Sequence, residues 1–224
     1  MTRRMILPFL FGIFGMAILI GLGVWQLQRL EWKEAVLADI DSRIGSAPVA
    51  IPAMPDPDAD RYLPVEAVGT FIGEELRVLA SVKLVGAGHR LVSAFETDGR
   101  RVLVDRGFLP LQTDAGTRPD GAVTVVGNIH WPDEIDGFTP APDLENNLWF
   151  ARDVAAMANA LGTEPVLIIA RDITPRSAAI TPMPVNSAGI PNDHLSYAIT
   201  WFSLAFVWLG MTALLLWRIR RKTD

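Results

Sequence analysis

Three histidines and no cysteine limit the metal chemistry open to this 224-residue chain. The absence of cysteine excludes disulfides and thiolate ligands. We interpret His89 and His130, which border predicted strands, as structural or surface residues. His194 differs because Asn192-Asp193 directly before it predicts a helix start, whose positive end disfavours a protonated imidazole. A neutral imidazole can ligate the iron of a porphyrin. An interfacial histidine that is hydrogen-bonded to the preceding loop is the alternative interpretation.

Other kinds of catalytic or metal site find little support in the sequence. There is no phosphate-binding loop, no Gly-x-Ser-x-Gly and no His-Glu-x-x-His. The alternating aspartates from Asp56 to Asp60 are separated by proline and alanine, which favours a solvated loop over a calcium site. Copper(I) carriers need clustered Cys, Met and His, whereas Met54, Met157 and Met183 are far apart. We therefore expect neither an enzyme nor a copper chaperone.

Two uncharged stretches must position His194. Met5 to Gln28 and Leu195 to Trp217 contain no Lys, Arg, Asp or Glu. At about 1.5 Å of helical rise per residue, each can cross a hydrocarbon core of about 30 Å. The sequence therefore predicts a two-pass membrane protein. Ala17 and Gly21 form a small-residue pair that predicts close helix packing.

The distribution of charge predicts the orientation. Arg3 and Arg4 precede the first stretch and four cations follow the second, whereas the segment between Arg29 and Asp193 has a net charge of −10. Cationic ends are typical of the cytoplasmic side. We expect a cytoplasmic end at 1–4, a span at 5–28, a periplasmic domain at 29–193, a span at 194–217 and a basic cytoplasmic tail at 218–224, in a bacterial cytoplasmic (inner) membrane. A cleaved signal peptide is disfavoured, because the apolar stretch is too long and no Ala-x-Ala site follows it.

The middle segment is predicted to be β-rich. Leu30 to Ile44 has helical spacing and continues the first span, and Ile173 to Pro191 has the composition of a loop. Asp98-Gly99 predicts a hairpin, and Asp153 and Gly162 are expected to bound a helix at Val154–Leu161. Strand-like runs occur at Val65–Phe71, Leu76–Ala80, Arg90–Thr97, Arg101–Phe108, Val123–Trp131, Leu148–Ala151 and Val166–Ala170. The expected fold class is a membrane α+β protein, with two transmembrane helices flanking one mainly antiparallel extracytoplasmic domain that contains one or two helices.

Five sequence blocks, in order over nearly the whole chain, resemble the Surfeit locus protein one family. The combination is specific, although each block alone is weak. In this chain the blocks read GVWQLQRLEWK (Gly23–Lys33), RYLPV with GTF (Arg61–Phe71), VDRGFLP (Val104–Pro110), NLWFARD (Asn147–Asp153) and NDHLSYAITWF (Asn192–Phe202). The chain departs from the family pattern at Leu30, where a second basic residue is common, and at Asp105, where Asn is common.

The resemblance implies an assembly factor for aa3-type cytochrome c oxidase that binds haem a transiently before its insertion into the large oxidase subunit. It implies His194 as the iron ligand and Arg29 as a partner for a haem propionate. The other implied cofactor-binding residues, matched by motif position, are Gly23, Trp25, Gln26, Tyr197 and Trp201.

The resemblance also implies partners. Oxidase subunit I and the lipid bilayer are expected partners, haem A synthase is a candidate partner, and no nucleic acid is expected. Two alternatives stay open at this point. One is a membrane scaffold that binds oxidase subunits without touching haem. The other is a signalling receptor, which is disfavoured because only seven residues follow Trp217.

Overall fold

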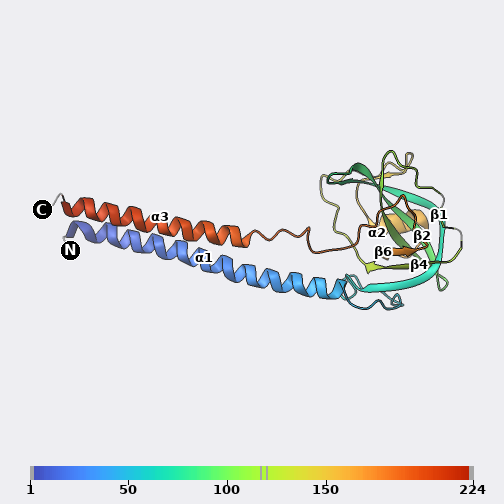
Figure 1. Ribbon diagram of the computed structural model, residues 1–224, viewed down its shortest axis with the longest axis horizontal. Helices are drawn as coiled ribbons and strands as arrows, with labels where there is room; N and C mark the ends of the chain where they lie inside the picture. The colour runs from blue at the N-terminus through green and yellow to red at the C-terminus, as the bar shows by residue number, and fades with distance from the viewer. Residues whose placement is uncertain (1–2, 117, 120, 222–224) are drawn as a thin grey trace. The chain divides into compact units, whose positions relative to one another are not determined.

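The computed structural model describes residues 3–116, 118–119 and 121–221. Residues 1–2 and 222–224, in the two predicted cytoplasmic tails, lie outside this part. The chain forms two compact units, a helical unit of Met1–Asp39 with Ser187–Asp224 and a barrel unit of Ile40–Asn186. In chain order the elements are α1 Arg3–Ile44, β1 Pro64–Val82, β2 Gly86–Thr97, β3 Arg100–Pro110, β4 Val123–Ile129, β5 Leu148–Trp149, α2 Val154–Leu161, β6 Leu167–Thr174 and α3 His194–Arg221 (Figure 1).

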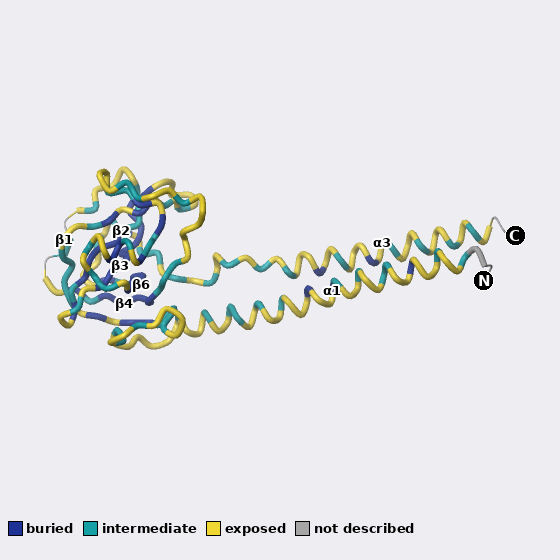
Figure 2. The backbone as a smooth tube through the Cα atoms, turned by 180° about the vertical axis from the view of Figure 1, so that it is seen from behind, coloured by how far each residue is buried: buried dark blue, intermediate teal, exposed yellow. Residues whose placement is uncertain are grey.

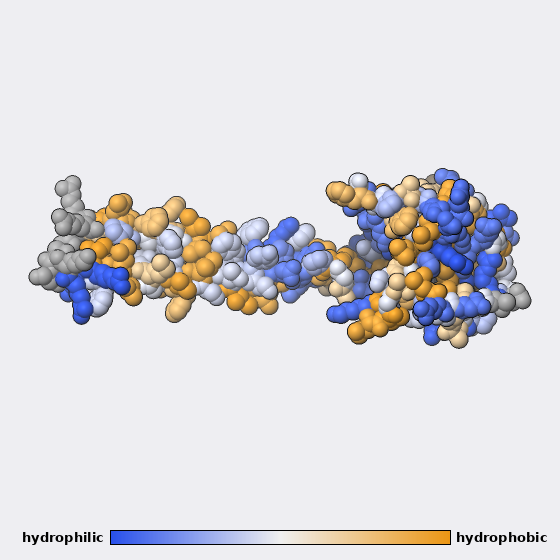
Figure 3. Space-filling view, turned by 90° about the horizontal axis from the view of Figure 1, so that it is seen from above, coloured by the Kyte–Doolittle hydropathy of each residue, from blue (hydrophilic) through white to orange (hydrophobic). Residues whose placement is uncertain are grey.

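The helical unit contains the two membrane spans that the sequence predicts. Helix α1 is one continuous helix of 42 residues and α3 has 28, and both are long and apolar enough to cross a membrane. The expected helical extension from Leu30 to Ile44 is confirmed, because α1 runs without a break to Ile44. On the face shown in Figure 3, hydrophobic side chains gather over the part of the helical unit near the ends of the chain, and Leu7 and Phe206 are each 78% exposed. Such surfaces are stable in lipid and costly in water.

The packing face of α1 differs from the predicted one. Ala17 and Gly21 are exposed, and a Cβ added to Gly21 would have no neighbouring atom within 4 Å. The expected small-residue contact is therefore wrong. Helix α3 instead lies against Gly12, Gly15 and Gly23, where an added Cβ would collide with Thr212, Trp208 and Phe202 respectively. Gly15 and Gly23 accept the large rings of Trp208 and Phe202, so this part of the interface is built from residues of unequal size.

The orientation of the two spans can be tested with reporter fusions. We expect a periplasm-dependent reporter joined after Gly116, in the barrel unit, to be active and one joined after Asp224 to be inactive. The physical reason is the retention of short cationic ends on the cytoplasmic side. An active fusion after Asp224 together with an inactive fusion after Gly116 would show that the orientation of the spans is the reverse.

The barrel unit is a closed sheet. The strand order is β2-β3-β6-β4-β1-β5, and β1 also pairs with β2, so β1, β2, β3, β6 and β4 form a ring. Pairing is antiparallel except between β3 and β6 and between β1 and β5. The predicted mainly antiparallel, β-rich domain is confirmed. Closure removes the free sheet edges within the ring.

Strand β1 makes the closure possible. The sequence predicts two strands here, but they are one strand of 19 residues. Its first part, Pro64 to Gly69, pairs with β4, and the part from Thr70 to Val82 pairs with β2. A register shift occurs between Ile72 and Glu75, where Gly73 has φ 59°. It bends the strand near the point where pairing changes from β4 to β2.

Two local predictions are confirmed in the barrel. Asp98 and Gly99 have φ values of 48° and 72° and join β2 to β3 in a tight hairpin. Helix α2 begins at Val154, as the sequence predicts, because the Asp153 side chain accepts a hydrogen bond of 2.9 Å from the Ala156 amide. Gly162, at φ 65°, ends the helix.

Strands β3 and β6 are buried on both faces, as Figure 2 shows by the dark colour at the centre of the domain. Inside the ring, Val104 and Ile168 belong to one apolar cluster. On the outer face, Leu103 and Ile169 pack in a second cluster with Met157 of α2. Helix α2 thus covers the apolar outer face that these two residues form.

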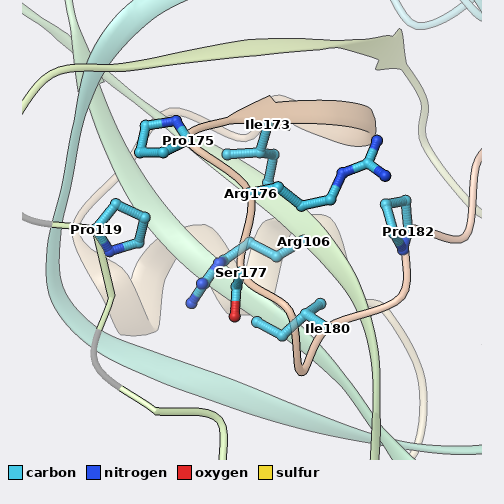
Figure 4. A pocket seen from close by; sticks show the side chains of 8 residues that line it. All are labelled: Arg106, Pro119, Ile173, Pro175, Arg176, Ser177, Ile180 and Pro182. Atoms are coloured by element: carbon cyan, nitrogen blue, oxygen red, sulfur yellow. The ribbon is translucent and has the colours of Figure 1, made fainter.

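The segment from Ile173 to Pro191 is only partly the predicted loop. Strand β6 continues to Thr174, and Thr181 exchanges two backbone hydrogen bonds of 2.8 and 2.9 Å with Phe108 of β3. Gly107 allows this approach, because it has φ 118° and an added Cβ would collide with the Thr181 carbonyl. We call residues 175–186, which lie over β3, the strap. A pocket beneath it, lined by Arg106, Ser177 and Ile180 among others (Figure 4), encloses only about 10 Å³. This volume holds at most one water.

Candidate functional site

The candidate site in the helical unit centres on a hydrogen bond between the two spans. His194 is the first residue of α3, as the sequence predicts. Its Nδ1 lies 2.8 Å from Oε1 of Gln26 on α1. Gln26 is a polar residue within an apolar span, and it is buried, with 9% of its surface exposed. A polar side chain at such a position needs a partner, and His194 supplies it.

This contact fixes the imidazole tautomer. A carboxamide oxygen can only accept, so Nδ1 carries the proton and donates it to Gln26. When the ring is neutral, its Nε2 atom then carries the lone pair. Histidines that bind metals commonly donate their other ring N–H to an oxygen in this way, which fixes the ring and raises its basicity. The residues therefore fit a single-histidine ligand to a porphyrin iron.

Two further predicted site residues lie on the interface between the helices. Trp201 is half-buried, and Ala198 between it and His194 is only 1% exposed. Gly23 is buried, but the Phe202 ring occupies the space beside it. The absence of a side chain at Gly23 therefore serves helix packing.

Three predicted site residues face outward. Trp25 and Tyr197 are 53% and 55% exposed. The Arg29 guanidinium lies 4.2 Å from the centroid of the Trp32 ring and is exposed. In the part of the chain that the structure describes, no ion pair involves Arg29, so its charge is available to an anion. Their proposed roles in cofactor binding stay predictions.

A second polar cluster lies in the barrel unit and was not predicted. Asp105 is fully buried, and its carboxylate accepts hydrogen bonds from Arg90 Nε at 2.6 Å, Arg152 Nη1 at 3.2 Å and the Gly107 amide at 3.0 Å. Arg152 also binds Glu134 through Nε and Nη2. Burial raises the pKa of Glu134, but the bonds from Arg152 outweigh it and hold this pKa below its usual value. The sequence signal was a charged pair, Asp105-Arg106, inside an apolar strand.

His130 borders this cluster. Its ring stacks on Tyr62 at 5.0 Å between centroids, with an interplanar angle of 22°. Tyr62 has φ 71°, which is unusual for a residue other than glycine, and Asn128 Nδ2 donates to its carbonyl at 2.9 Å. Burial, followed by the charges of Arg152 and Arg61, lowers the pKa of His130 to about 4. His130 is therefore neutral at physiological pH.

Comparison with known proteins places the chain in a family. The model of the SURF1 family matches residues 13–206, which include both Gln26 and His194. The chain belongs to the SURF1 family. The resemblance inferred from the five sequence blocks is thereby confirmed.

The SURF1 relatives include animal proteins and a bacterial protein. Surfeit locus protein 1 of Rattus norvegicus is 31% identical over 219 residues, which cover 87% of this chain and 71% of that protein. The SURF1-like protein of Drosophila melanogaster is 33% identical over 218 residues, covering 84% and 72%. The SURF1-like protein of Rickettsia felis is 30% identical over 200 residues, covering 84% and 87%. A bacterial SURF1 protein with both spans is consistent with these matches.

Proposed function

We propose that this SURF1 protein is an assembly factor for cytochrome c oxidase that holds haem a and assists its insertion into subunit I. Membership of the family indicates the assembly role. The haem step rests on one observation, the hydrogen bond between His194 Nδ1 and Gln26 Oε1. This bond leaves Nε2 of a neutral imidazole free to ligate iron.

The protein contributes orientation and charge in this proposal. Gln26 holds the imidazole in one tautomer at the start of α3. Arg29, which is exposed, offers its guanidinium to a propionate. The bound haem a would supply the iron. The chain would hold it through a single histidine and exposed aromatic side chains, which suits transient binding and release. We place the barrel unit in the periplasm and the spans in a bacterial cytoplasmic membrane.

The residues give no support for chemistry on the haem itself. Within the described residues, no group of three or more His, Asp or Glu side chains could hold a metal ion. One imidazole at the helix interface suits the holding of haem, so we propose a carrier with oxidase subunit I as the receiver. Haem A synthase, which makes haem a, is the candidate donor.

The absorption spectrum of the purified full-length protein tests the haem step. We expect a Soret band and about one haem a per chain when the protein is produced in cells that make haem a, and no band in cells that do not. A protein that carries no haem but co-purifies with subunit I would instead be the scaffold considered above, and the haem proposal would fail.

A further inference from the structure

The barrel unit has an open polar cavity of about 320 Å³ that the proposed function does not use. Its wall combines three basic or imidazole side chains with a thioether and two aliphatic side chains. These lining residues are Arg90, His130, Arg152, Ile169, Met183 and Val185. They come from β2, β6, the strap and the segments that follow β4 and β5, so folding alone brings them together.

Several blocks that carry the family resemblance converge here without a role in haem binding. Arg152 belongs to one block and lines the cavity. Asp105 lies in another block, at a position where the chain departs from the family pattern, and accepts hydrogen bonds from both Arg90 and Arg152. Tyr62 belongs to a third and stacks on His130. Residues from three separate parts of the sequence therefore line the cavity or contact the residues that line it.

The arginines of the cavity have hydrogen-bonding capacity left over. A guanidinium has five N–H groups. Arg90 uses three of them, on Asp105 and on the carbonyl and sulfur of Met183. Arg152 also uses three, on Glu134 and Asp105. Each arginine thus keeps two N–H groups without a partner among the described residues.

The imidazole adds an unpaired polar atom. His130 Nδ1 is buried and has no hydrogen-bond partner in the described part of the chain. Burial lowers the pKa of this ring, and the charges of Arg152, Arg61 and Arg90, which outweigh that of Glu134, lower it further. An environment that opposes a protonated imidazole favours an anion. Arg61, Arg90 and Arg152 together carry one more formal charge than Asp105 and Glu134, so a monoanion fits better than a dianion.

We propose that this cavity binds a carboxylate that is attached to a small aliphatic body. A planar carboxylate matches the paired N–H groups of an arginine better than a tetrahedral phosphate with two charges would. The half-buried aliphatic side chain of Val185 provides contact for the apolar part. The volume lies within the range of small-molecule pockets. The carboxylate could come from a free acid or from an acidic side chain of a partner protein. The proposal does not depend on haem binding.

Calorimetric titration of the full-length protein in nanodiscs tests the proposal. The probes are hexanoate, the uncharged hexanamide of the same shape, and N-acetyl-glutamate amide, which mimics an acidic side chain within a protein. We expect hexanoate or the blocked glutamate to bind at least about tenfold more tightly than hexanamide. Tighter binding of hexanoate identifies a free acid, and tighter binding of the blocked glutamate identifies a protein side chain. Affinities for both acids no better than that for hexanamide would overturn the proposal.

Substitutions inside and outside the cavity test where the acid binds. Val185→Phe fills the cavity without altering its charges, and we expect it to abolish binding of the better acid while the circular dichroism spectrum stays unchanged. Val85→Phe, in the exposed turn between β1 and β2, is the matched control and should bind normally. Arg152→Lys retains the charge but loses the planar guanidinium with its paired N–H donors, and should weaken binding about tenfold. Unchanged binding by Val185→Phe would place the ligand elsewhere and refute the site.

Discussion

Replacing His194 with alanine is expected to abolish the Soret band of the haem a complex, while the amount of membrane-inserted protein stays near that of the wild type. The substitution removes the only imidazole at the helix interface, and the 28-residue apolar helix that it begins is otherwise unaltered. Absorption spectra and haem-to-protein ratios of the purified variants measure the effect. His89→Ala, in strand β2 of the barrel, is the control and should keep the full spectrum.

Gln26 gives this prediction a second, graded test. Gln26→Leu leaves His194 Nδ1 without its 2.8 Å partner, so the ring can rotate and lose its tautomer. Loss of such a supporting contact typically weakens metal binding about 10–100-fold. Gln28→Leu, on the exposed side of the same helix, should have no effect. If His194→Ala keeps an unchanged haem a spectrum and stoichiometry, the ligand assignment is wrong and the scaffold becomes the better interpretation.

Asp105→Ala should produce the largest loss of stability in the barrel unit. The carboxylate is fully buried and forms ion pairs with Arg90 and Arg152, whose side chains are only 12% and 13% exposed. Breaking a buried ion pair by removing one partner costs about 3–5 kcal/mol, because the remaining charge is buried without compensation. For a domain of this size, such a loss lowers the melting temperature by about 10 °C.

Thermal unfolding of the full-length protein, followed by tryptophan fluorescence, measures this loss. Asp105→Asn should lose less stability than Asp105→Ala, because the amide oxygen can still accept from an arginine. Glu96→Ala removes the exposed partner of Arg101 and is the control, with an expected change below about 1 kcal/mol. Equal melting temperatures for Asp105→Ala and Glu96→Ala would show that the buried network does not hold the fold.

The sequence by itself determined the features that depend on neighbouring residues. An uncharged stretch that is long enough to span a bilayer is a local property, so both spans could be predicted. The same holds for the caps of α2, for the Asp98-Gly99 hairpin and for the position of His194 at the start of α3, because each depends on a few adjacent residues.

Only the tertiary structure decided which distant residues meet. Strand β1 closes the barrel by pairing with β4 and then with β2, and a period-2 pattern does not specify its partners. The packing face of α1 carries Gly12 and Gly23 instead of Ala17 and Gly21, since a helix that is apolar all round does not reveal its contact side. The bond from His194 to Gln26 spans 168 residues of sequence, and it is this contact that turns an interfacial histidine into a candidate ligand with one defined tautomer.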